Sequence, residues 1–154
     1  MQFKQGLETV PELRTAYRIG LGAIKAGHRD RIVCADTRKL AGSVDLDSTL
    51  GASLPNDPRW DYGIGIRDTQ EADRIHWIEV HPALDGDVKD ILKKHDWLKA
   101  WLTRRAPDLL KMTASVKGYA WVATKRIGFR QGSPKAKQLA VHGISFPCKM
   151  FTIP

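Results

Sequence analysis

Two stretches in the middle of the chain have the residue period of β-strands. In residues 59–67, large apolar side chains alternate with small or acidic ones, which predicts a strand with one apolar face. The residues on that face are Trp60, Tyr62, Ile64 and Ile66. Residues 74–81 are apolar at most positions, which is typical of a central strand covered on both faces. We expect one side of this second strand to hold Ile75, Trp77, Glu79 and His81.

Apolar residues at helical spacing predict three helices. They span residues 11–26, 87–103 and 133–142. Thr9 and Asp85 can cap the first two helices, and Ser133, at the start of the third, can cap that one. Pro107 is expected to stop the second helix, because a proline lacks the N–H that a helix interior needs.

The remaining pattern predicts further strands and the connections between them. The additional strands are residues 31–35, 42–50 and 119–127, with a strand or extended tail over residues 146–153. Turn-forming residues predict a loop at residues 51–58, and the polar stretch 68–73 joins the two central strands.

The order of these elements indicates the fold class. Three neighbouring strands before the second helix suggest hairpins, whereas strand, helix and strand in succession suggest a crossover between parallel strands. We therefore expect an α/β fold, formed as a single domain over residues 1–154, with a mixed central sheet flanked by helices.

Acidic residues on the two central strands are the best candidate site. Glu79 lies between Ile78 and Val80, and a carboxylate inside an apolar strand is costly unless it is paired or binds a metal. Asp61 occupies a matching position in the preceding strand, and His81 follows on the same face as Glu79. Asp61, Glu79 and His81 are therefore the first candidates for chemistry.

Composition narrows the classes of protein that fit. No apolar run is long enough to span a membrane, and the N-terminus lacks the apolar core of a signal peptide. The only cysteines, Cys34 and Cys148, are far apart and form no metal-binding pair. We expect a cytoplasmic protein without a structural zinc site.

Positive charge is concentrated in the C-terminal third. Residues 1–103 hold 15 Lys and Arg against 16 Asp and Glu, whereas residues 104–154 hold 10 basic residues and a single acidic one, Asp108. The formal net charge of +8 therefore comes from the second part. Such a surface either meets a polyanion such as nucleic acid or is simply solvated.

The order of elements, with an Asp on the second core strand and Glu-x-basic on the third, resembles the PD-(D/E)XK superfamily of restriction-endonuclease-like nucleases. Asp61 stands in Arg-Trp-Asp-Tyr, and Glu79-Val80-His81 stands where (Asp/Glu)-x-Lys would be. The resemblance covers roughly residues 8–127. It implies a restriction-endonuclease-like core and phosphodiester hydrolysis with Mg²⁺ or Mn²⁺ held by Asp61 and Glu79.

The lysine of the family pattern is replaced by His81 in this chain. His81 is either a base, a metal ligand or a strand-end histidine bonded to backbone. Some members of the superfamily carry the lysine on the following helix, where Lys94 lies at the edge of the apolar stripe and Lys93 points to solvent. Lys94 therefore either performs the lysine function or extends its stem along the core edge into water.

Simpler roles compete for the acidic residues as well. Asp61 and Glu79 could form ion pairs with Arg59, Arg67 or a lysine across the sheet. The superfamily often adds an acid from its first helix, here Glu8 or Glu12, although a carboxylate near a helix start also favours the helix dipole. Asp45 and Asp47 share a face of their predicted strand. Asp47 could reach the site, and the simpler alternative is that the pair faces water or caps a turn.

The densest basic stretch follows the last predicted long strand. Its members are Lys125, Arg126, Arg130, Lys135 and Lys137, and they suit phosphate contacts to DNA or RNA. The expected function is a metal-dependent nuclease, and the alternative is a catalytically inactive protein of the same fold that binds nucleic acid or assembles with proteins. The oligomeric state stays open, a homodimer included.

Overall fold

The computed structural model describes residues 1–68 and 72–154. The polar connection expected at residues 68–73 joins the two candidate-site strands, and its central part, residues 69–71, lies outside the described residues. No helix in the described ranges is long and apolar enough to cross a membrane.

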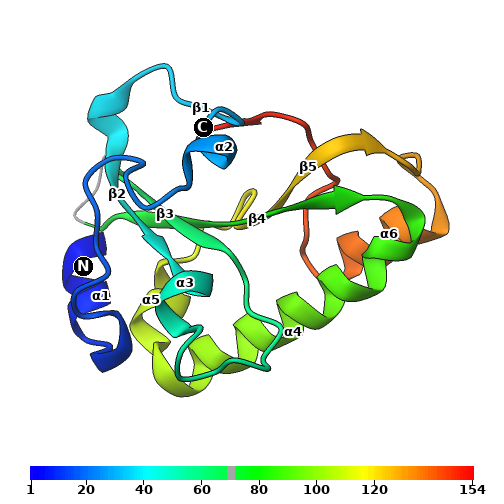
Figure 1. Cartoon of the computed structure of the whole chain (residues 1–154). Helices are drawn as coiled ribbons and strands as arrows, with labels where there is room; N and C mark the ends of the chain where they lie inside the picture. Colours follow the sequence, from blue (N-terminus) through cyan, green and yellow to red (C-terminus); the bar gives the residue numbers. More distant parts are fainter. Residues whose placement is uncertain (69–71) are drawn as a thin grey trace.

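A four-stranded mixed sheet forms the centre of the molecule (Figure 1). Its strands, in spatial order, are β2 (Leu40–Asp45), β3 (Tyr62–Ile66), β4 (Arg74–Ala83) and β5 (Tyr119–Ile127). The β2–β3 and β3–β4 pairs are antiparallel, whereas β4 and β5 are parallel. The expected hairpins and crossover are therefore confirmed, and so is a mixed sheet flanked by helices.

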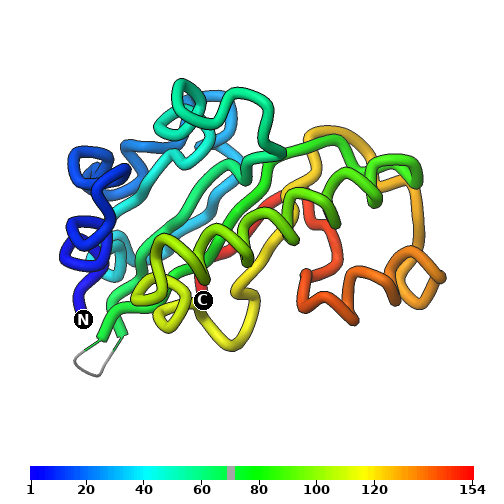
Figure 2. The backbone as a smooth tube through the Cα atoms, turned by 90° about the horizontal axis from the view of Figure 1, so that it is seen from below, coloured from blue at the N-terminus to red at the C-terminus, as the bar shows by residue number. Residues whose placement is uncertain are grey.

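Helices cover one face of this sheet. The elements of this layer are α1 (Phe3–Glu8), α3 (Leu46–Leu50), α4 (Val88–Arg105), α5 (Pro107–Met112) and α6 (Pro134–Val141). The longest helix, α4, connects β4 to β5 and runs diagonally across the sheet (Figure 2). Its buried stripe consists of Val88, Ile91, His95, Leu98, Trp101 and Leu102.

The other face carries a smaller layer. It contains α2 (Ala26–Arg29) and a separate pair of parallel strands, β1 (Ile32–Val33) and β6 (Phe151–Thr152). Figure 1 shows α2 and β1 on the side of the sheet away from α4. The two faces have separate apolar clusters, so both sides of β4 are buried, as its sequence predicts.

The side chains of β4 and β5 alternate between the two faces of the sheet, as the sequence predicts. Trp77 and Trp121 point to the α4 layer, whereas Ile78 and Val122 point to the α2 layer. The same prediction is wrong for Trp60, which packs in the α4 layer while Tyr62 packs in the other. The reason is that β3 begins only at Tyr62, so that the regular alternation does not extend back to Trp60.

The helix expected at residues 11–26 is not formed. Only a short 3₁₀ turn, Pro11–Leu13, is present before an irregular segment that leads to α2. Gly20 adopts a φ of +56°, which a right-handed helix excludes. Arg18 instead exchanges two backbone hydrogen bonds with Ser43 of β2, at 3.0 and 2.9 Å, and this pairing overrides the helical periodicity.

Only the first part of the strand expected at residues 42–50 forms, as the end of β2. It ends at Asp45, whose carboxylate accepts a hydrogen bond from the Ser48 N–H at 2.8 Å and caps α3. Asp45 and Asp47 therefore do not share a strand face.

The strand at residues 119–127 and the helix capped by Ser133 form as expected. Pro107 ends α4 as predicted, but it also begins α5, which the sequence pattern did not indicate.

Candidate active site between β3, β4 and α4

Asp61 and Glu79 lie side by side, as their positions in the two strand patterns predict. Tyr62 pairs with Ile78, and because the strands are antiparallel, Asp61 comes opposite Glu79. The Asp61 N–H donates to Glu79 Oε1 at 3.0 Å, and the Val80 N–H donates to Asp61 Oδ2 at 3.0 Å. These two hydrogen bonds hold both carboxylates at the point where β3 begins.

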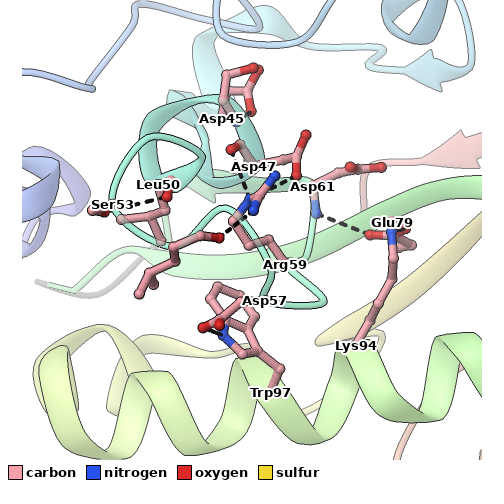
Figure 3. Close-up of polar contacts among 12 residues, drawn as sticks. Asp45, Asp47, Leu50, Ser53, Asp57, Arg59, Asp61, Glu79, Lys94 and Trp97 are labelled. Carbon is pink, nitrogen blue, oxygen red and sulfur yellow. Dashed lines mark hydrogen bonds and ion pairs between the residues drawn. The ribbon is translucent and has the colours of Figure 1, made fainter.

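Lys94 reaches this pair from the helix (Figure 3). Its Nζ lies 2.5 Å from Glu79 Oε2. Glu79 is fully buried, whereas the Lys94 side chain is 23% exposed. Of the two roles considered for Lys94, the structure therefore shows the ammonium at the carboxylates and not an aliphatic stem that extends into water.

Burial and like charge make this cluster electrostatically strained. Burial, together with the neighbouring Asp61 carboxylate, raises the pKa of Glu79 to about 8, although Lys94 opposes the shift. Burial also raises the pKa of Asp61, against the Val80 N–H and Lys94. Burial is the largest single effect on Lys94 and disfavours its ammonium, but Glu79, Asp61 and Asp47 together outweigh burial and raise the Lys94 pKa. The two acidic side chains thus share one ammonium.

Arg59 forms its ion pair with Asp47 and not with Asp61 or Glu79. Its Nε lies 3.1 Å from Asp47 Oδ1 and donates to the Asp47 carbonyl, and its Nη1 donates to the Leu54 carbonyl. The Trp97 indole N–H donates to Asp57 at 2.8 Å. Figure 3 shows these contacts beside Asp61 and Glu79. They fasten the loop at residues 51–58 to α3 and α4, and Asp47 lies next to the site as the partner of Arg59.

His81 is bonded to backbone. Its Nδ1 lies 2.7 Å from the Pro82 carbonyl and 3.9 Å from Asp87 Oδ1. Across residues 1–68 and 72–154, we find no hydrogen bond from the His81 ring to Asp61 or Glu79. The backbone-bonded alternative for His81 therefore fits the structure better than its use as a base at this site.

The acids considered from the first helix lie elsewhere. Glu8 is the exposed last residue of α1, so its predicted place near a helix start is wrong. Glu12 forms two hydrogen bonds, at 2.8 and 2.7 Å, with the guanidinium of Arg105. Arg67, a candidate partner of the acidic pair, donates instead to the carbonyls of Arg38 and Leu40.

The sequence did not predict that His28 contacts Tyr62, the residue after Asp61. His28 Nδ1 lies 2.7 Å from the Tyr62 hydroxyl, and the two rings meet edge to face. Burial and the nearby acids Asp45, Asp61 and Asp47 raise the pKa of Tyr62 to about 12. His28 lies in a short helix that no apolar pattern marks, so its contact with Tyr62 could not be predicted from the sequence.

The basic stretch lies along the end of β5 and into α6. Lys125, Arg126, Arg130 and Lys137 are exposed, and Lys135 is half-buried. Ile127 pairs with Ala83, so the stretch begins at the end of β4 that lies beyond His81. It begins on β5, the strand that pairs with the β4 strand of Glu79.

The described residues contain no group of three or more His, Cys, Asp or Glu side chains arranged to hold a metal ion. No family model, no curated protein and no solved structure matches this chain. The basis for a functional hypothesis is therefore the chemistry of Asp61, Glu79 and Lys94 and the sheet that positions them.

Proposed function

We propose that this chain is a metal-dependent phosphodiesterase, a nuclease with a restriction-endonuclease-like core whose lysine is supplied by α4. The observation that carries the proposal is the 2.5 Å contact of Lys94 Nζ with Glu79, beside Asp61. The antiparallel order β2–β3–β4, followed by a helix and the parallel strand β5, supports it, because the resemblance implies that order.

The donor set suits a hard divalent cation. Mg²⁺ is commonly held by one or two carboxylates, and waters and substrate phosphate oxygens complete its shell, so a cage of three protein ligands is not required. Asp61 and Glu79 would be the protein ligands here. A bound Mg²⁺ or Mn²⁺ would polarise the phosphodiester and lower the pKa of water at the site.

Lys94 has donors left over for the reaction. An ammonium has three N–H groups, and one of them is directed at Glu79. The others can orient the attacking water and offset the negative charge that develops on the phosphate. Because Lys94 lies within the 18-residue helix α4 and contacts the fully buried Glu79, the ammonium is already in position before substrate binds.

The exposed basic residues of β5 and α6 are the proposed nucleic-acid contacts. Lys125, Arg126 and Arg130 can neutralise phosphates of DNA or RNA without reading sequence, and Lys135 and Lys137 add charge at the start of α6. The substrate class is therefore a nucleic acid held by its backbone.

One observation favours a second function. Both oxygens of Glu79 already accept a hydrogen bond, one from the Asp61 N–H and one from Lys94. If these bonds are kept in solution, the pair is a buried structural cluster, and the chain is a non-catalytic nucleic-acid-binding or assembly module of the same fold.

A cleavage assay separates the two functions. The wild-type chain is incubated with single-stranded and duplex DNA and RNA in Mg²⁺ or Mn²⁺, with EDTA as control. Cation-dependent cleavage that disappears in Asp61→Asn supports the nuclease. Binding of nucleic acid without cleavage of any substrate supports the module.

A further inference from the structure

We propose that a hollow beside α6 binds an unpaired nucleobase, so that the nucleic acid this chain binds is single-stranded. This inference rests on the proposed function, because it adds a base-binding site to the proposed backbone contacts. The hollow has a volume of about 280 Å³. It is lined by apolar side chains and by two polar ones, namely Ala136, Ala140, Ile144, Phe146, Gln131 and Lys137.

The size and charge of the hollow suit one flat ring of an anionic chain. Drug-sized ligands occupy pockets of about 300–1,000 Å³, so this smaller volume favours a single ring system over a whole nucleotide. Residues 109–154, which include all of the lining residues, contain no Asp or Glu. An apolar hollow in such a basic segment matches a ligand that joins an apolar ring to negative charge, which a nucleic-acid strand does.

A row of aromatic rings holds Phe146 at the hollow. Its ring centroid lies 5.5 Å from that of Phe129, edge to face, and Phe129 lies 5.9 Å from the fully buried Trp121. Trp121 is the register partner of Glu79, so the row leads from the neighbour of the candidate active site to the hollow. Phe146 itself is half-buried. An anchored ring that is partly exposed is a surface on which a base can stack.

The polar side chains around the hollow are available to a ligand. The Ser133 N–H donates to the Arg130 carbonyl at 3.2 Å and closes a turn in which Gly132 has a φ of +80°. Gln131 is exposed in this turn. Among the residues that the structure describes, the side chains of Arg130, Gln131 and Lys137 have no hydrogen bond or ion pair. The Gln131 amide can therefore bond a base edge, while Arg130 and Lys137 neutralise flanking phosphates.

The hollow discriminates between single strands and duplexes. In a duplex, each base is paired and stacked, so that it must be flipped out before it can meet a side-chain ring. A single strand presents its bases directly, and stacking on an aromatic ring tolerates any sequence because every base has a flat face. The basic residues alone would hold both forms, whereas Phe146 acts only on an unpaired base.

Three probes that differ in their free bases test the inference. They are a single strand, an abasic strand with the same phosphates, and the matched duplex, each prepared in DNA and in RNA. Affinities are measured in EDTA, so that no cation-dependent cleavage occurs. Phe146→Leu removes the ring but keeps an apolar side chain. We expect it to lose about 10-fold in affinity for the intact single strand and less than about 2-fold for the abasic strand and the duplex.

Matched variants separate stacking from a structural role of Phe146. Phe146→Trp keeps a ring and should bind the intact strand at least as tightly as the wild type does. Ala140→Leu fills the hollow from an exposed position and should reproduce the loss on the intact strand, even if Phe146→Leu folds poorly. Val141→Ala, at an 84% exposed position on α6 that does not line the hollow, should leave all three affinities unchanged.

The outcomes distinguish this inference from the proposed function. Equal losses on the three probes in Phe146→Leu and Ala140→Leu, or no loss on any, would overturn the inference while the nuclease proposal stands. A wild-type dimer in sedimentation that Ala140→Leu dissociates would also overturn it, because the hollow would then hold a second copy of the chain. A wild type that binds no probe would overturn both. Preference for the intact strand without cleavage would support the inference and refute only the nuclease.

Discussion

Lys94 and Glu79 are 15 positions apart in the chain, yet the ammonium of one lies 2.5 Å from the carboxylate of the other. The contact is possible because α4 runs back across the face of the sheet on which Glu79 lies, with Ile91 and Leu98 buried one turn before and after Lys94. A cationic group thus reaches the acid from the helix, on the same face of the sheet as Glu79, although no lysine follows Glu79 on its own strand.

The cluster predicts opposite effects of two substitutions on stability. Asp61→Asn removes one of two neighbouring buried carboxylates, and the new amide oxygen can still accept the Val80 N–H. It should raise the melting temperature in EDTA by about 2–4 °C. Lys94→Met leaves both carboxylates without their ammonium and should cost about 3 kcal/mol of unfolding free energy. Calorimetric melts measure both, and an Asp61→Asn protein that melts below the wild type would contradict the electrostatic account.

A buried histidine predicts sensitivity to acid. His95 is 1% exposed, and within the described structure neither of its ring nitrogens has a hydrogen-bond partner. Burial and the nearby Lys99 lower its pKa to about 4, helped by His142 and opposed by Asp96. Besides these groups, the rings of Trp60 and Tyr119 pack against it.

The sign of the pH effect follows from the lowered pKa. The unfolded chain takes up the His95 proton near pH 6.5, whereas the folded chain does so only near pH 4. The contribution of neutral His95 to the free energy of unfolding is therefore complete above pH 6.5. It falls as the pH drops toward 4, by about 3 kcal/mol in total. His95→Leu should lose this part of the acid sensitivity, and His142→Gln, which removes only the smallest named cause, should keep most of it. Equal slopes of melting temperature against pH in wild type and His95→Leu would contradict the assignment.

Metal binding should depend on both carboxylates. We expect weak binding of Mn²⁺ by titration calorimetry in the wild type and no measurable binding in Asp61→Ala or Glu79→Ala, because one carboxylate leaves too few hard ligands. Asp85→Ala, at an exposed acid away from the site, is the matched control and should bind as the wild type does. Unchanged heats in both site variants would show that the cation binds elsewhere.

Nucleic-acid affinity should fall steeply with salt. Each phosphate that a lysine or arginine neutralises releases counterions, so the logarithm of affinity falls linearly with the logarithm of salt concentration. Replacing Lys125, Arg126 and Arg130 by alanine should reduce the magnitude of that slope for duplex DNA by about 2–3. A control triple variant of the exposed Arg14, Lys39 and Lys111 should keep the slope. An equal reduction in both triple variants would show that the salt dependence reflects the total charge of the chain and not contacts made by Lys125, Arg126 and Arg130.

The sheet was predictable from the sequence because its signals are local. β4 and β5 carry strong apolar patterns, and α4 carries a complete stripe, so their types, faces and order follow from periodicity alone. The adjacency of Asp61 and Glu79 follows from the same register. Lys94 could be named as a candidate from its position on the helix, but its contact with Glu79 depends on the angle at which α4 crosses the sheet.

The errors occur where tertiary contacts override local pattern. Residues 11–26 have helical spacing, yet Arg18 pairs with β2 and Gly20 breaks the helix. Asp45 looks like a strand residue, but its carboxylate caps α3. His28 could not be predicted at all, because its approach to Tyr62 depends on how an irregular segment folds over the sheet.

We propose that Lys94, and not His81, performs the lysine function. Lys94→Ala, Lys93→Ala and wild type are compared in Mg²⁺ or Mn²⁺ at 20 °C on the nucleic acid that the wild type cleaves best, and binding of uncleaved substrate is measured in parallel with EDTA. Lys93, one position earlier and exposed, is the matched control. We expect Lys94→Ala to lose at least about 100-fold in cleavage with binding unchanged, because its contribution is made in the transition state, and Lys93→Ala to match the wild type. Full cleavage activity in Lys94→Ala, or a wild type that binds nucleic acid but cleaves none, would contradict the account.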